Sequence, residues 1–337
     1  SLRDGSFSHS GTHPWPYKYV SLMTWFPSFP HISLTSMEWH NMMQSKRLDF
    51  FLIPATVFTT VTLLIDPLLL FCILRNQSFR QETRYLLLAN TLLSDALFLV
   101  FNLANLSSNA ANLEMHFTVC EVITVTTMTT YCSSVLTVTL MVIDTFLAVR
   151  WPLRYNQILP PSRAIKLIGF VWAVAALYPL ILLVVMEVSE KGIPQRLKVC
   201  VVLITLGSLG NNVKVPLYIY INSWVIVCMV LIFYCYIRLY TITKSSGIWS
   251  SRYSRARLTL LAHALMLLMY FVPGLIYTAQ LGLFDKNVTF KVWLNTVNLS
   301  VLMLLPRACA PYLYGLRYRS LLDFFGLNKP RAITPIT

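Results

Sequence analysis

Apolar residues along the chain gather into seven long stretches that are separated by shorter polar segments. Each stretch is close to the about 20 residues that a helix needs to cross the hydrocarbon core of a bilayer. Strands of a membrane β-barrel would be about ten residues long and would alternate in polarity, which these stretches do not. The pattern predicts an all-α membrane protein, a seven-transmembrane helix bundle over residues 50–316 with spans at about 50–74, 85–106, 117–149, 165–186, 214–240, 255–281 and 291–316.

The segments on either side of this domain differ from it in composition. Residues 1–49 are polar and aromatic with no period, so we expect an extracellular tail without regular structure. Residues 317–326 combine leucine and phenylalanine with arginine, which predicts a short amphipathic helix in the membrane interface, followed by a cytoplasmic tail at 327–337. The first residue is Ser and no signal-peptide pattern precedes the first apolar stretch. We therefore expect the chain to begin after a removed initiator Met or a trimmed segment.

Composition and charge narrow the class further. Hydrophobic residues make up 56% of the 337 residues and charged residues 12%, with a mean hydropathy of +0.62. Soluble proteins carry about 25% charged residues, so a water-soluble enzyme of this size would lack polar surface. The net charge of +14 would suggest nucleic acid as a partner of a soluble chain. In a membrane protein it instead indicates basic cytoplasmic loops that meet anionic lipid headgroups, and we expect no nucleic-acid partner.

The loops give the orientation. The segments after the first, third, fifth and seventh stretches are rich in Lys and Arg and contain two acids, Glu82 and Asp323, whereas the opposite segments are mixed in charge. Basic loops face the cytoplasm, which predicts an extracellular N-terminus and a cytoplasmic C-terminus in the plasma membrane. On the outer side, Asn287 begins an Asn-X-Thr sequon and is the candidate glycosylation site. The sequons at Asn105 and Asn298 fall at or within spans.

The sequence offers little for catalysis or metal binding. Apart from Cys120 and Cys200, the five cysteines lie well inside apolar stretches, where Cys behaves as a small apolar residue. We find no Cys/His spacing typical of zinc, no catalytic Ser/His arrangement and no inverted repeat of a transporter. We therefore expect neither an enzyme nor a transporter, and neither a cofactor nor a bound metal.

Short motifs follow the seven stretches in a characteristic order. They are Leu92-Leu93-Ser94-Asp95 in the second stretch, Cys120 at the start of the third, Ala148 to Tyr155 after it, Trp172 in the fourth, Cys200 in the second outer loop, Pro273 in the sixth and Pro311 to Arg317 at the end of the seventh. In this order and spacing they resemble the rhodopsin-like (class A) G-protein-coupled receptors over about residues 50–326. The resemblance implies a receptor for an extracellular ligand, here unknown, that signals to heterotrimeric G proteins.

The resemblance also implies a disulfide between Cys120 and Cys200. Both cysteines fall on the outer, oxidising side of the membrane by the loop charges. Two independent free thiols are the alternative.

A buried charge in the seventh stretch needs a partner. In the family, the position of Asp95 anchors a sodium ion, and Ser134 is a remnant of the polar groups around it. Arg307 lies one turn before Pro311, on a face toward the same cavity. An Arg near a helix centre costs about 3 kcal/mol to insert, so we expect a carboxylate beside it. Asp95 is the expected partner, with Asp66 as an alternative or shared partner and a water-filled cavity as a third possibility.

The resemblance places the ligand in the outer half of the bundle. Thr127 replaces the Asp of amine receptors and Leu304 replaces the Lys of opsins, which argues against an aminergic ligand and excludes a retinal Schiff base. Glu114 and Glu121 near the outer rim either meet a cationic ligand or are simply solvated. The candidate pocket residues, each of which could instead serve helix packing, are Thr127, Met128, Tyr131, Phe271, Leu275, Thr278, Ser300 and Leu304.

The inner end departs from the family pattern. Thr145 replaces the Arg that holds the inactive state and then meets the G protein, Ala310 replaces the Asn before the last proline, and Phe271 replaces the sixth-helix Trp. These departures favour an alternative function, an atypical seven-helix receptor or scaffold with little or no G-protein coupling. The residues expected to face a G protein are Asp144, Thr145, Phe146, Pro152, Leu153 and Tyr314.

Overall fold

The computed structural model describes residues 41, 50, 52–111, 113–188, 196–197, 200, 211–245, 254–282 and 288–310. Nearly all of these residues are helical. The elements in chain order are α3 (Leu52–Arg75), α4 (Gln77–Arg80), α5 (Thr83–Ala110), β1 (Met115–His116), α6 (Phe117–Arg150), α7 (Tyr155–Ile158), α8 (Pro161–Val188), β2 (Arg196–Leu197), α10 (Asn211–Ser245), α11 (Ser254–Gly282), α12 (Val288–Val297) and the π-helix η3 (Asn298–Leu302).

The predicted seven-helix architecture is confirmed. Each apolar stretch contains one long helix, and the seventh runs from α12 through η3 and is helical again over residues 305–310. Within the described residues, six helices are long and apolar enough to cross a bilayer, and α11 adds a shorter apolar segment, Ala264–Gln280. The short helices α4 and α7 and the β1–β2 pair were not predicted. The amphipathic helix expected at 317–326 and both tails, apart from residue 41, lie outside the described residues.

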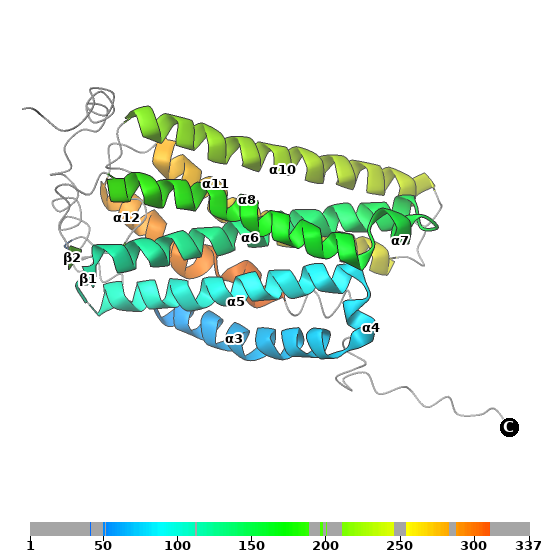
Figure 1. Ribbon diagram of the computed structural model, residues 1–337, viewed down its shortest axis with the longest axis horizontal. Helices are drawn as coiled ribbons and strands as arrows, with labels where there is room; N and C mark the ends of the chain where they lie inside the picture. The colour runs from blue at the N-terminus through cyan, green and yellow to red at the C-terminus, as the bar shows by residue number, and fades with distance from the viewer. Residues whose placement is uncertain are drawn as a thin grey trace, which may run out of the picture.

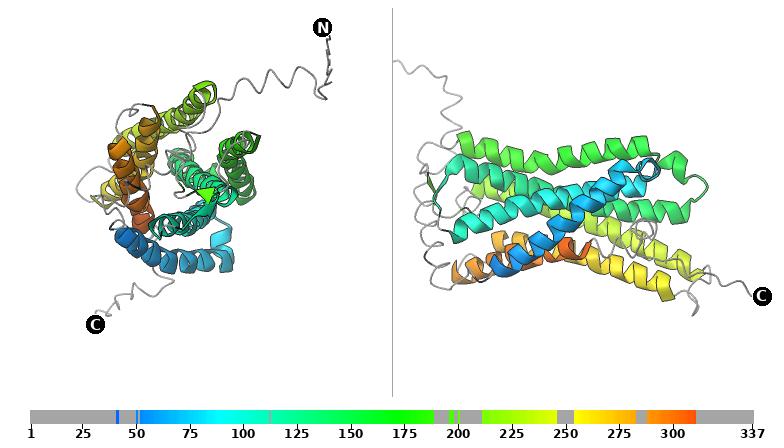
Figure 2. Two further views of the ribbon diagram at one scale, coloured as in Figure 1. Left: turned by 90° about the vertical axis from the view of Figure 1, so that its left-hand side faces the viewer. Right: turned by 90° about the horizontal axis from the view of Figure 1, so that it is seen from below.

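Helix α6 forms the centre of the bundle. It contacts α5, α8, α10 and α11, while α3 packs against α5 and η3 (Figure 2). The β1–β2 pair lies at the end where α6 begins, and α4 and α7 lie at the opposite end (Figure 1). Following the orientation that the loop charges predict, we call the first of these the outer end and the second the inner end. A residue's place along α6 therefore gives its depth in the bundle.

The distribution of side chains is the reverse of that in a soluble protein, with apolar side chains facing outward and polar ones inward. Helix α3 exposes Leu64, Leu68 and Phe71, each more than half exposed, and buries Thr62 and Asp66. Lipid tails do not penalise exposed apolar side chains, so such helices associate through packing and interhelical hydrogen bonds. An apolar exterior around a polar interior is the arrangement expected of a multi-pass membrane protein.

One polar junction joins three helices. The amide nitrogen of Asn90 on α5 donates to the hydroxyl of Thr137 on α6 at 2.8 Å, and the indole nitrogen of Trp172 on α8 donates to the amide oxygen of Asn90 at 2.8 Å. Asn90 and Thr137 are buried, so these hydrogen bonds form in a medium without competing water. They fix the relative rotation of α5, α6 and α8.

A close contact joins α6 to α11 at a proline. The hydroxyl of Tyr131 donates to the backbone carbonyl of Tyr270 at 2.7 Å, one turn before Pro273. Pro273 cannot donate to the carbonyl of Met269, which weakens the helix next to the carbonyl that Tyr131 holds. Gly274 makes room for the tyrosine, because a Cβ at this position would lie 2.8 Å from the Tyr131 hydroxyl oxygen.

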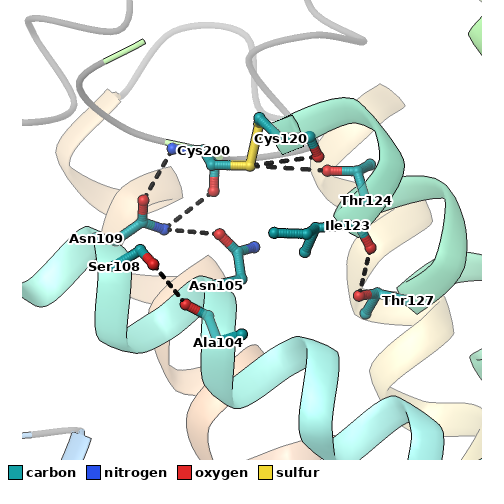
Figure 3. The surroundings of a disulfide bond; sticks show 9 residues. All are labelled: Ala104, Asn105, Ser108, Asn109, Cys120, Ile123, Thr124, Thr127 and Cys200. Atoms are coloured by element: carbon teal, nitrogen blue, oxygen red, sulfur yellow. Dashed lines mark hydrogen bonds between the residues drawn. A yellow bond between two sulfur atoms is a disulfide. The ribbon is translucent and has the colours of Figure 1, made fainter. Parts of the chain in front are cut away.

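The expected disulfide is present at the outer end. Cys120 on α6 is bonded to Cys200, and Asn109 at the end of α5 holds Cys200 from the other side (Figure 3). The amide nitrogen of Asn109 donates to the carbonyl of Cys200 at 3.0 Å, and the backbone N–H of Cys200 donates to the amide oxygen of Asn109 at 2.8 Å. The antiparallel pair of β1 and β2 adds a second attachment. Cys200 is therefore attached to both α5 and α6, and β2 to the segment between these two helices.

The disulfide gives the first prediction. It closes a loop with a sequence separation of 80 residues, which contributes about 4 kcal/mol in the chain-entropy model. Cys120→Ser and Cys200→Ser should each lower surface expression and thermal stability, and the double variant should be no worse than either single one because the two residues act as a unit. Cys72→Ser, at a free thiol in α3, is the control and should change little. Strictly additive losses would contradict the bond.

The contact between Tyr131 and Gly274 gives the second prediction. Gly274→Ala should destabilise the bundle by about 1 to 3 kcal/mol, because the added methyl displaces the Tyr131 hydroxyl. Tyr131→Phe should lose about 1 kcal/mol with its hydrogen bond. Once the hydroxyl is absent, however, adding Gly274→Ala should cost little more. Unfolding of the four proteins in detergent measures this double-mutant cycle, and full additivity of the two changes would show that the contact is not formed.

Candidate functional site

Arg307 in the seventh helix is the largest fully buried side chain among the described residues. Its side chain is fully buried, and its Nε lies 3.1 Å from Oδ1 of Asp95 on α5, which forms an ion pair. Its Nη1 also donates to the carbonyl of Met303. Asp95 accepts two further hydrogen bonds, from the hydroxyl of Ser134 to Oδ1 at 2.8 Å and from the hydroxyl of Tyr270 to Oδ2 at 2.5 Å. Asp95, Ser134, Tyr270 and Arg307, together the ionic centre, thus join four helices.

Aromatic rings enclose the guanidinium of Arg307. Its Cζ lies 3.7 Å from the ring centroid of Phe98, 5.5 Å from that of Tyr131 and 5.6 Å from that of Tyr270. A cation over an aromatic face is stabilised by about 2 kcal/mol when both are desolvated. The carboxylate and the ring faces therefore replace much of the hydration that Arg307 lacks.

Asp66, the alternative partner, interacts electrostatically with both Asp95 and Arg307 but forms no ion pair with Arg307 among the described residues. It is buried in α3 beside Pro67, and its Oδ1 has no hydrogen-bond partner among the described residues. The same holds for Nη2 of Arg307. The guanidinium is thus paired with Asp95 on one edge and keeps unused donor capacity on the other.

A cavity of about 170 Å³ lies above the ionic centre, in the half of α6 that begins at Cys120. Five of the candidate pocket residues line it: Thr127, Met128, Tyr131, Phe271 and Thr278. Its lining side chains from α8 and α10 were not predicted, because none of them belongs to a motif shared with the family. The cavity's other lining residues are Phe98, Cys132, Val135, Leu136, Val174, Ala175, Tyr178, Tyr220, Trp224, Val225, Cys228, Gly274, Tyr277, Leu299 and Met303.

Three candidate pocket residues do not line this cavity. Leu275 is 40% exposed on the outside of α11, because the inward face of that helix runs through Phe271 and Gly274. Ser300 and Leu304 are buried elsewhere, and Leu304 packs in a cluster with Phe98.

The π-helix accounts for the change in the seventh helix. Leu299 and Met303, each one residue before an expected position, line the cavity instead. They flank or lie within η3, Asn298–Leu302. A π-turn holds one more residue than an α-turn and so rotates the faces of the helix around it. Spacing in the sequence alone does not reveal such a turn.

The outer acids lie away from the cavity. Glu121 is buried beside Cys120 and lines a separate small hollow, so it is not the solvated rim charge that we considered. Glu114 is exposed before β1. Asn287, the candidate glycosylation site, lies outside the described residues. Within the described residues, no group of three or more His, Cys, Asp or Glu side chains could hold a metal ion.

The inner end of α6 borders a larger hollow of about 560 Å³. The carboxylate of Asp144 accepts a hydrogen bond from the hydroxyl of Tyr155 on α7 at 2.5 Å, and the hydroxyl of Thr145 donates to the carbonyl of Met141 at 2.7 Å. Both Asp144 and Thr145 line the hollow, together with the start of α5 and Pro161 of α8.

The remaining residues expected at the inner surface have different surroundings. Phe146 is buried, with its ring edge-on to Trp151 and Tyr234. Pro152 is exposed and Leu153 is 97% exposed in the turn after α6. Tyr314 lies outside the described residues.

Comparisons with known proteins agree with this arrangement. The sequence model of the family described as "7 transmembrane receptor (rhodopsin family)" matches residues 66–309. The chain is 33% identical over 329 residues to the Homo sapiens protein named "Probable G-protein coupled receptor 148", covering 95% of this chain and 94% of that protein. It is 24% identical over 295 residues to the Danio rerio protein named "Odorant receptor 131-2", covering 82% and 85% respectively. The chain therefore belongs to the rhodopsin family of seven-transmembrane receptors and is a receptor rather than an enzyme.

Proposed function

We propose that this receptor lies in the plasma membrane with its N-terminus outside, binds an extracellular ligand in the outer cavity and activates a heterotrimeric G protein at its inner end. One observation carries the proposal. Phe98 and Tyr131 line the cavity and also contact Arg307 of the ionic centre. A ligand against these two rings therefore touches side chains that pack on Arg307, and Arg307 belongs to the ionic centre that joins four helices.

The proposed coupling between ligand binding in the cavity and the ionic centre acts through free energy. A ligand shifts a conformational equilibrium only if it binds one state more tightly than the other. Moving Phe98 or Tyr131 changes the stabilisation of a fully buried cation, so a small displacement in the cavity has a large effect on the ionic centre. Tyr131 also holds the backbone of α11 beside Pro273, which supplies a mechanical connection to a helix that its internal proline allows to bend.

We further propose that Arg307 takes the place of the sodium ion that the family binds at the position of Asp95. The guanidinium occupies one carboxylate oxygen of Asp95, while Ser134 and Tyr270 donate to the carboxylate as well. A fixed cation leaves no electrostatic reason to admit a mobile one. The receptor's stability should therefore be independent of whether the salt is sodium or potassium.

The inner end supports a second candidate function. Thr145 is short and uncharged, and its hydroxyl donates to its own helix backbone, so it supplies no cation next to Asp144. A receptor built this way could bind its ligand with little or no nucleotide exchange on a G protein. Basal or ligand-evoked exchange with any class of G protein would favour the first function over this one.

The third prediction tests the inner end. Thr145→Arg should raise nucleotide exchange several-fold at matched surface expression, because it places a cation beside Asp144 and the inner hollow. Thr145→Val, which removes the hydroxyl and keeps the size, is the control and should leave exchange unchanged. The measurement is guanine-nucleotide exchange across several G-protein classes. Equal output from wild type and Thr145→Arg would argue against coupling through this end of α6.

The fourth prediction tests the ionic centre. Arg307→Ala and Asp95→Ala should each destabilise the receptor by about 3 to 5 kcal/mol, because each leaves the other charge buried and unpaired. Exchanging the two, Arg307→Asp with Asp95→Arg, should recover part of the folding yield. Arg238→Ala, at an exposed arginine of α10, should change stability by less than about 0.5 kcal/mol.

Two results would contradict this assignment. One is a well-folded Arg307→Ala protein. The other is a wild-type thermal stability that rises with sodium but not with potassium. Asp66→Asn should be milder than Asp95→Asn, and equal damage would mean that Asp66 shares the pairing.

A further inference from the structure

The outer cavity is small. Its volume of about 170 Å³ is close to the about 150 Å³ of an engineered apolar protein cavity that stays dry and binds benzene. A molecule enclosed by it is therefore about the size of one aromatic ring with a short substituent.

The wall of the cavity is almost wholly apolar. Most of its lining side chains among the described residues are aromatic or aliphatic, and none carries a formal charge at neutral pH. Aromatic rings come from every side, among them Phe98 of α5, Trp224 of α10 and Phe271 of α11. Such a wall holds an occupant by dispersion and by the exclusion of water.

The hydroxyls of the two threonines in the wall are already bonded to the backbone. Thr127 donates to the carbonyl of Ile123 at 2.7 Å, and Thr278 donates to that of Leu275 at 2.9 Å. The Tyr131 hydroxyl donates to the backbone of α11. None of these three hydroxyls has its proton available for an occupant.

Two further tyrosines present only their rings to the cavity. Tyr178 of α8 and Tyr277 of α11 line it, but the hydroxyl oxygen of each has less than 1 Å² of accessible surface. These oxygens have no hydrogen-bond partner among the described residues, and an occupant does not reach them. A polar group carried into the cavity would therefore lose its hydration without gaining a hydrogen bond from either phenol.

Charge is excluded for a similar reason. The buried cation Arg307 does not line the cavity, and the ring of Phe98, which does, lies against its guanidinium. The charge of Arg307 is already paired with Asp95. An ion in the cavity would be desolvated without meeting an opposite charge.

One side of the wall borders the bilayer. Trp224 lines the cavity and is 38% exposed within the apolar span Asn222–Ile242 of α10. Its ring lies edge-on to that of Tyr220 at 6.2 Å between centroids, and Tyr220 stacks on Tyr178 of α8 at 5.9 Å. The three rings form a wall from α8 to the exposed face of α10. The hydrocarbon beyond this face concentrates neutral apolar molecules and excludes ions.

We infer that the ligand of the outer cavity is an uncharged, hydrocarbon-like molecule about the size of one ring, held by apolar contact alone. This inference rests on the proposed function for the choice of site and adds the chemical class of the ligand. The volume of the cavity, the lack of accessible polar partners and the side wall against the bilayer all favour this class.

The test is a binding assay with four probes of similar size on the purified full-length receptor in nanodiscs, with empty nanodiscs subtracted. The probes are isopropylbenzene, acetophenone, benzoate and 2-phenylethylammonium, and ligand-observed NMR gives each dissociation constant against the free aqueous concentration. Isopropylbenzene should bind at least about tenfold more tightly than acetophenone, which has a similar shape but buries a carbonyl without a hydrogen bond. Both charged probes should bind at least about a hundredfold more weakly than isopropylbenzene.

Variants that fill the cavity assign the binding to this site. Ala175→Leu on α8 and Val225→Phe on α10 each add carbon atoms to the wall and should weaken the binding of isopropylbenzene about tenfold or more. Ala173→Leu and Val227→Phe make the same changes at exposed positions of the same two helices. They are the matched controls and should bind as the wild type does. The filling variants lie on different helices, so a folding defect in one leaves the other informative.

Four results would overturn the inference. They are binding of acetophenone as tight as that of isopropylbenzene, binding of either charged probe at that affinity, no binding of isopropylbenzene, and unchanged binding in both filling variants. The assay contains no G protein, so a failure of nucleotide exchange would reject the proposed signalling and leave the ligand class standing. Signalling that only charged ligands evoke would reject the ligand class and leave the proposed signalling standing.

Discussion

The burial of Arg307 against Asp95 constrains the rest of this bundle. A permanent cation with no exposed surface needs a carboxylate and aromatic faces within a few ångströms, and these come from α5, α6 and α11. The four helices must therefore hold one mutual register for the charge to be satisfied. Ser134 and Tyr270 occupy the remaining capacity of the carboxylate, so a helix that moves breaks an ionic or charge-assisted hydrogen bond in a medium that offers no water as a replacement.

This constraint connects the two ends of the receptor. Phe98 and Tyr131 line the outer cavity and lie against Arg307 of the ionic centre, and Tyr131 holds α11 where Pro273 weakens its backbone. Below the centre, α6 continues to Asp144 and Thr145 at the inner hollow. The polar junction at Asn90 holds α5, α6 and α8 together, whereas α11 and the seventh helix are joined to α5 and α6 through the ionic centre.

The sequence predicted those features that depend on local composition or on a single charge. Seven apolar stretches of membrane-spanning length predicted seven helices, and a lone arginine in the seventh required a nearby acid. In the seventh helix, Ser300 and Leu304 were expected to line the cavity, and each comes one residue after the residue that does so. The shift comes from the π-turn, which depends on packing and is not visible in the sequence. Tyr178 and Tyr277 escaped notice for a related reason. An aromatic residue in an apolar stretch shows its unpaired hydroxyl only after the neighbouring helices are in place.

The most direct measurement of the central ion pair is the exchange of the arginine side-chain protons with solvent. In receptor labelled with ¹⁵N-arginine, the account predicts one Nε–H resonance with strongly slowed exchange. It should disappear in Arg307→Lys and shift in Asp95→Asn, while the resonances of the exposed loop arginines exchange quickly. If every arginine Nε–H exchanged at the rate of an exposed side chain, Arg307 would not be buried against Asp95, and the account of the bundle given above would be wrong.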